Sequence, residues 1–179
     1  MAYSKWLKSD LHIHSHMSKK TKNNDYDGET LTVDKLVTAL ERESINFFSI
    51  TDHNIINESL YSELLQRRAD LISKNLNFVI GAEIDFYDAE VHDKTFHMLV
   101  FFNTNDLTSV SKVLADIFDK ESMNQIGTDE TPVSLSKFFK SVFDNGIKDI
   151  ITIPHFNSKE KGLPPEDQID KFTYTVYSA

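Results

Sequence analysis

Short apolar runs alternate with amphipathic stretches along most of the chain. The runs are near-continuously apolar and only a few residues long, which is typical of strands buried on both faces; they cover residues 6–12, 45–50, 78–80, 97–102 and 147–153. Apolar residues recur at helical spacing between them, which predicts helices at 32–44, 58–74, 109–119 and 134–143. This alternation predicts an α/β fold with a parallel sheet.

Polar residues support several of these boundaries. Thr32 or Asp34 is a suitable N-cap for the first predicted helix, and Asn145-Gly146 is a suitable C-cap for the last. Segments 15–30 and 159–170 are polar or charged and are predicted to be loops. The lysine-rich stretch 19–24 is either a solvated loop or the rim of a site beside it.

Composition narrows the class of protein. The 179 residues fit one domain over residues 1–179, with no membrane-spanning apolar run, no signal peptide pattern and therefore no expected membrane partner. The formal net charge of −9 argues against a broad basic face for nucleic acid, although a local basic patch or a bound metal would still attract phosphate. The absence of cysteine excludes disulfides and thiolate metal sites, and it fits a reducing, cytoplasmic setting.

Candidate metal ligands stand at or near the ends of the predicted strands. Six residues with nitrogen or oxygen donors do so: His12, His14, His53, Glu83, His97 and His155. Active sites of parallel α/β proteins lie where the carboxyl ends of several strands meet, so these donors are expected to converge. A set without soft ligands suits Zn, Mn or Fe better than copper. Each residue alone also fits an ordinary polar or surface role, so the prediction rests on the whole set.

Glu83 has a further possible role, because a carboxylate bridges two cations where an imidazole normally does not. Two bridged ions about 3.5–4 Å apart are the arrangement that cleaves phosphate esters. The sequence therefore favours a phosphoester-cleaving site that holds two ions, or three with additional ligands.

Several motifs occur in a recognisable order. They are Asp10-Leu-His-Ile-His14, Asp27-Gly28 leading into helix 33–39, Ile50-Thr-Asp-His53-Asn54, Gly81-Ala-Glu83, His97-Met-Leu-Val and Ile153-Pro-His155. In order, strand context and approximate spacing, the sequence resembles the PHP domain, the polymerase and histidinol phosphatase superfamily, from about residue 5 to residue 157. The resemblance implies a distorted (β/α)7 barrel with two or three divalent metal ions (Zn, Mn or Fe) at its mouth, and it implies phosphoester hydrolysis.

The resemblance also implies a role for each motif residue. His12 and His14 would bind one ion, which Glu83 would bridge to a second ion held by His97 and His155. His53 would help to hold a third ion.

The same resemblance implies roles for three aspartates. Asp10 and Asp52 resemble groups that orient the neighbouring imidazoles. Asp27 fits an Asp-Gly pattern that faces the metals in many members, but an insertion over residues 19–26 separates it from the histidines.

One departure concerns the end of the chain. The superfamily usually has a late Asp-x-His motif, whereas no histidine follows His155, and a (β/α) barrel typically takes about 250 residues. Two interpretations follow. Either the late barrel strands follow Ala179, with residues 174–179 beginning one of them, or the chain is a shortened member with weak first and third metal sites.

Three functions follow from these observations. The first is a metal-dependent hydrolase of phosphoester bonds, a phosphatase or a nuclease acting on a phosphorylated small molecule or nucleic acid, with catalytic residues unassigned. The second is a weakly active or inactive metal-binding module that is fused to, or associates with, an ATPase or polymerase. The third is a histidinol-phosphate-type phosphatase, which is disfavoured because Arg42, Arg67 and Arg68 all lie in predicted helices.

Overall fold

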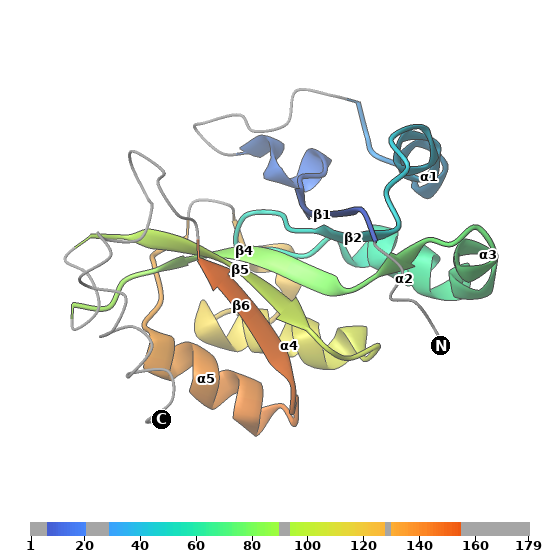
Figure 1. Cartoon of the computed structure of the whole chain (residues 1–179). Coiled ribbons are helices and arrows are strands. Elements are labelled where there is room, and N and C mark those ends of the chain that lie inside the picture. The colour runs from blue at the N-terminus through green and yellow to red at the C-terminus, as the bar shows by residue number, and fades with distance from the viewer. Residues whose placement is uncertain (1–6, 21–28, 90–93, 128–129, 155–179) are drawn as a thin grey trace.

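The computed structural model describes residues 7–20, 29–89, 94–127 and 130–154. Six strands form two three-stranded sheets (Figure 1). The first sheet is parallel, in the order β1 (Ser9–Ile13), β2 (Phe47–Ile50) and β3 (Asn77–Phe78). The second is antiparallel, in the order β4 (Ile80–Phe86), β5 (Phe96–Phe102) and β6 (Ile150–Pro154).

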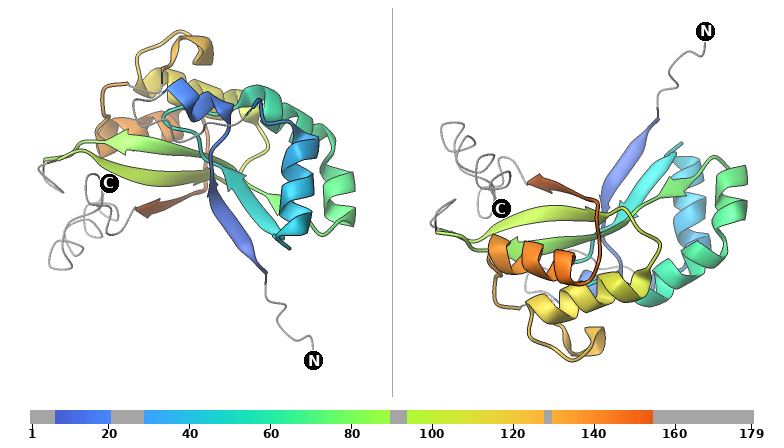
Figure 2. Two further views of the ribbon diagram at one scale, coloured as in Figure 1. Left: turned by 90° about the horizontal axis from the view of Figure 1, so that it is seen from above. Right: turned by 90° about the horizontal axis from the view of Figure 1, so that it is seen from below.

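Five α-helices and two 3₁₀ helices accompany the sheets in the described part of the chain. They are η1 (His16–Lys20), α1 (Val33–Arg42), α2 (Glu58–Gln66), α3 (Arg68–Ser73), α4 (Leu107–Ile117), η2 (Met123–Gln125) and α5 (Leu135–Asp144). Helices α4 and α5 lie together on one face of the second sheet, whereas α1, α2 and α3 lie beside the first (Figure 2). The predicted mixed α/β fold is confirmed.

The prediction of one parallel sheet is correct for the first sheet and wrong for the second. Parallel strands need a long crossover connection, but only nine residues separate Phe86 from Phe96, so β4 and β5 pair as antiparallel neighbours. A closed (β/α)7 barrel is not seen among the described residues, whose strands form two open sheets.

Most predicted helix ends are confirmed to within about two residues. Thr32 caps α1 by accepting a hydrogen bond from the Lys35 N–H. Helix α5 ends at Asp144 with Asn145 as its C-cap, followed by Gly146 at a φ of 71°. The predicted helix 58–74 is instead two helices, because α2 ends at Gln66 and α3 begins at Arg68.

The core is rich in aromatic side chains. All seven residues of β4 and all seven of β5 are buried. The rings of Phe86 and Phe138 meet edge to face with centroids 5.4 Å apart, which joins the second sheet to α5. This packing fixes the two long strands that carry Glu83 and His97.

The two sheets meet along a line that we call the seam, between residues 47–54 and strand β4. The Asn54 N–H donates to the Glu83 carbonyl at 2.6 Å, and the Glu83 N–H donates to the Asp52 carbonyl at 3.0 Å. Gly81 also lies in the seam, where a Cβ atom would stand 2.4 Å from the Ser49 hydroxyl oxygen. Only glycine therefore permits this close approach of strands without rearrangement.

The hydroxyl of Tyr61, on α2, forms hydrogen bonds with both sides of the seam. It accepts hydrogen bonds from the N–H groups of Ile50 (3.0 Å) and Gly81 (2.9 Å), and it donates to the Ile50 carbonyl at 2.7 Å. Burial raises the pKa of Tyr61 to about 12, so the hydroxyl keeps its proton. One side chain thus connects β2 of the first sheet to β4 of the second.

Candidate metal centre

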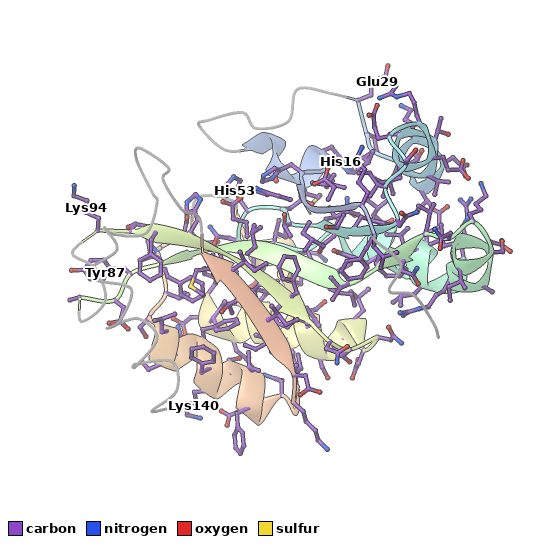
Figure 3. All side chains as sticks on the ribbon, in the orientation of Figure 1. His16, Glu29, His53, Tyr87, Lys94 and Lys140 are labelled. Carbon is purple, nitrogen blue, oxygen red and sulfur yellow. The ribbon has the colours of Figure 1, made fainter. Side chains whose placement is uncertain are left out.

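Four imidazoles surround the Glu83 carboxylate at one end of the seam. Oxygen Oε2 of Glu83 lies 3.2 Å from His12 Nε2, 3.5 Å from His14 Nε2 and 3.4 Å from His53 Nδ1. The other oxygen, Oε1, lies 2.6 Å from His97 Nδ1. Figure 3 labels His53, whose ring stacks on that of His14 at a centroid distance of 4.9 Å. The predicted convergence of these five residues is therefore present in the structure.

The remaining predicted ligands cannot be placed. His155 and Asp27 lie outside the described residues. His16 is among the described residues and has a different contact. Its Nδ1 accepts a hydrogen bond from the Leu31 N–H at 3.2 Å. His16 belongs to neither group of histidines around Glu83.

Each ligand candidate is positioned by a different part of the fold. His12 lies on β1, His14 follows it, His53 lies in the loop after β2, and His97 is the second residue of β5. Glu83 was predicted to follow a strand, but it stands in the middle of β4, since that strand continues to Phe86. Its position is fixed on both sides, by pairing with Leu99 on β5 and by the seam bonds.

Asn54 turns the chain that carries His53. Its φ is 58°, a left-handed conformation that asparagine tolerates better than most residues. Its side-chain oxygen accepts from the Asp85 N–H at 2.9 Å, and its amide nitrogen lies 3.3 Å from Asp85 Oδ2. These bonds secure the turn to β4 and so place His53 beside Glu83.

The donor atoms fit a cation. Two groups, His12–His14–Glu83 and His53–Glu83–His97, each bring three donor atoms within 4.8 Å of one another, and Glu83 belongs to both. The donors are nitrogen and oxygen only, as Zn, Mn and Fe accept, and the shared carboxylate is 1% exposed. The His/Glu cluster is thus suited to divalent metal binding.

Electrostatics keep the central carboxylate ionised. Burial alone raises the pKa of Glu83, but hydrogen bonds with His12 and His97, together with the charge of His53, outweigh it and hold the pKa below its ordinary value. At His14, in contrast, burial dominates and lowers the pKa despite the attraction of Glu83. An anionic carboxylate beside a neutral imidazole is the protonation state that metal binding requires.

His97 lies between two carboxylates. Its Nδ1 faces Glu83, and its Nε2 forms an ion pair with Asp85, the residue directly opposite it on β4. Burial alone lowers the pKa of His97, but the hydrogen bonds with Asp85 and Glu83 outweigh it and raise the pKa to about 9. Asp85 therefore orients this imidazole, a role that the sequence reasoning missed.

The metal-free protein is expected to lose stability as the pH rises from 6.5 to 9. The folded state holds a proton on His97 up to a pKa of about 9, against 6.5 ordinarily, so this stabilisation is complete below 6.5 and disappears through 9. The loss is roughly 1–3 kcal/mol in the free energy of unfolding, measured by urea denaturation with a chelator present. A His97→Gln variant should lack this slope, and an equal slope in the variant would contradict the assignment.

The two aspartates predicted to orient imidazoles, Asp10 and Asp52, differ from each other in burial and in contacts. Asp10 is exposed, and its Oδ1 accepts from the backbone N–H of His12 at 3.2 Å. Asp52 is fully buried and accepts three hydrogen bonds: two from Ser15, at 2.6 Å each, and one from the Ser18 hydroxyl at 2.7 Å. Ser18 in turn lies 2.9 Å from His14 Nδ1, so Asp52 reaches the cluster through a serine.

A cavity lies away from the cluster, toward the other end of β5. It has a volume of about 690 Å³ and is lined in part by Leu11, Phe47, Phe78, Phe101 and Ile151. The cluster side chains do not line it. The His/Glu cluster and this cavity are therefore separate features.

Comparisons with known proteins agree with the fold. No protein-family model and no curated protein matches the sequence. A crystal structure from Bifidobacterium adolescentis, which carries the provisional name of metal-dependent phosphoesterase, matches with a TM-score of 0.58. The match covers 94% of this chain and 74% of that chain, at 14% sequence identity, so the two proteins share a fold.

The lengths and polarity of the helices bear on whether they could span a membrane. Within residues 7–20, 29–89, 94–127 and 130–154, each helix is too short or too polar to cross a bilayer.

Proposed function

We propose that this protein is a metal-dependent phosphoesterase. The observation that carries the proposal is the buried Glu83 carboxylate, which two groups of histidine donors share. The structural likeness to the Bifidobacterium protein supports the same reaction class. Membership of the PHP superfamily is part of the proposal, and the order of the motifs from Asp10 to His155 supports it.

The residues that would hold the ions follow from the distances. His12, His14 and Glu83 would hold one ion, and His53, Glu83 and His97 another, with His155 as an additional ligand from the sequence. Two or three ions of Zn, Mn or Fe are proposed. In this grouping His53 joins Glu83 and His97, although the resemblance gave it to a third ion. A bound divalent cation would stabilise the negative charge that develops on phosphoryl oxygens.

The protein's own residues prepare the site for that task. Hydrogen bonds with His12 and His97 keep Glu83 anionic, and Asp85 holds His97 in place. The seam bonds fix the backbone of Glu83 against the loop that carries His53. Such preorganisation matters because electrostatic stabilisation acts without reorganisation at the moment of reaction. The substrate we propose is a phosphorylated small molecule or nucleic acid.

The direct test uses the purified chain, first stripped of metal and then given Zn, Mn or Fe(II). We expect metal binding, followed by metal-dependent hydrolysis of p-nitrophenyl phosphate or of a single-stranded oligonucleotide. His12→Asn should lose the ion proposed for His12, His14 and Glu83, and with it the hydrolysis, whereas His16→Asn, outside the cluster, should keep full metal binding and hydrolysis. Failure to bind any of these metals would contradict the proposed function. Metal binding without hydrolysis would instead favour the inactive module of a larger ATPase or polymerase assembly.

A further inference from the structure

Ser18 links the buried Asp52 carboxylate to one histidine of the cluster. Its hydroxyl oxygen lies 2.7 Å from Asp52 Oδ1 and 2.9 Å from His14 Nδ1, and the residue is fully buried. A hydroxyl has a single proton, so it donates to one of these neighbours and accepts from the other. The direction of this proton decides which nitrogen of His14 carries hydrogen.

The surrounding bonds determine that direction, starting from the backbone. The N–H of Leu60 donates to Asn57 Oδ1 at 3.1 Å, so the Asn57 amide nitrogen faces Ser15 Oγ, at 3.0 Å. Ser15 Oγ also accepts from the Met17 N–H at 3.2 Å. With two donors directed at its oxygen, the Ser15 hydroxyl gives its own proton to Asp52.

Asp52 is therefore an acceptor of hydrogen bonds on both oxygens. Oδ2 receives the Ser15 hydroxyl, and Oδ1 receives the backbone N–H of Ser15. A carboxylate attracts the Ser18 proton more strongly than a neutral imidazole does, because hydrogen bonds to charged groups are roughly twice as strong. The backbone N–H of His53 also points at the Ser18 oxygen, at 3.3 Å, and this contact is compatible with the same direction.

We propose that Ser18 is a positioning residue that holds His14 as the tautomer protonated on Nδ1. Nδ1–H donates to Ser18, and the lone pair remains on Nε2, which lies 3.5 Å from Glu83 Oε2 and 3.0 Å from His12 Nε2. Metal-binding histidines commonly have their tautomer set by such a partner on the other nitrogen. The role of His14 as a ligand rests on the proposed function; its tautomer does not.

Nitrogen-15 NMR of the histidine rings in the metal-free protein reads the tautomer directly, with His14→Asn used to assign the signal. We expect His14 to be protonated on Nδ1 in the wild type and to lose that preference in Ser18→Ala. Zn²⁺ affinity, measured by calorimetry, should fall by about 10–100-fold in Ser18→Ala. Ser15→Ala is the matched control, since it removes a hydroxyl from the same carboxylate but from the oxygen opposite Ser18.

The outcomes separate the possible explanations. A wild-type His14 protonated on Nε2 overturns the inference, whether or not Ser18→Ala folds. Equal tautomer shifts in Ser15→Ala and Ser18→Ala overturn it too, because they indicate a general loss of structure. Ser18→Thr retains the hydroxyl and should retain the Nδ1–H signal. An absence of phosphoester hydrolysis with the Nδ1–H signal intact overturns only the proposed function.

Discussion

Replacing Glu83 with glutamine is expected to abolish metal-dependent activity. Glutamine keeps the size of the side chain but removes the anionic oxygens that both donor groups share. Loss of one outer partner of a metal ligand costs about 10–100-fold in metal affinity, and loss of the shared ligand should exceed the upper end of that range. The hydrolysis rate should fall by at least roughly 10²–10³-fold. Calorimetry with Zn²⁺ and Mn²⁺, followed by a phosphatase assay, measures both effects.

Two further variants make this experiment decisive. Glu43→Gln removes an exposed carboxylate from the end of α1 and should leave binding and hydrolysis unchanged. Glu83→Asp keeps the charge on a shorter side chain and should recover part of the metal affinity. A Glu83→Gln protein that is folded and binds metal with wild-type affinity would show that the carboxylate is not a ligand.

Replacing Tyr61 with phenylalanine is expected to destabilise the fold without changing a side chain of the His/Glu cluster. The N–H groups of Ile50 and Gly81 would lose the hydroxyl oxygen that accepts from both of them, in a fully buried position. An unsatisfied buried donor costs about 1–3 kcal/mol, so for these two donors we expect a loss of about 2–6 kcal/mol in the free energy of unfolding. Urea denaturation of the metal-free protein measures it.

The matched control for this substitution is Tyr87→Phe, because Tyr87 is 47% exposed. It should change the free energy of unfolding by less than about 0.5 kcal/mol. A Tyr61→Phe variant as stable as the wild type would mean that water or a rearranged backbone replaces the hydroxyl. The seam would then be held by its direct backbone bonds alone.

The cluster histidines were predictable because local rules place them. His12 and His14 are two residues apart on or just beyond a strand, and His53 comes three residues after the end of a buried apolar run, so their side chains gather at one edge. Glu83 was predicted to belong to the site but at the wrong point of its strand. At Val79 the chain passes from the first sheet to the second, and periodicity does not show which strand becomes the partner.

The polar residues that support the cluster were less predictable. Ser18 meets Asp52 across 34 positions of sequence, and Asp85 meets His97 only because β4 and β5 pair in one particular register. A serine in a polar loop gives no sign of burial. Asp85 did leave a weak signal, since it stands two residues after Glu83 in a run that is otherwise apolar and therefore shares its face of the strand.

The position of Glu83 in the second sheet also determines when, during synthesis, all residues of the His/Glu cluster have been added to the chain. His12 leaves the ribosome 71 residues before Glu83, a delay of roughly 4–14 s at ordinary elongation rates. During that interval β1 and β2 are able to pair, but the carboxylate that both donor groups share has not been made. At that stage the nascent chain has these histidines without their central acid, so under the proposed function metal binding would have to follow the synthesis of β4.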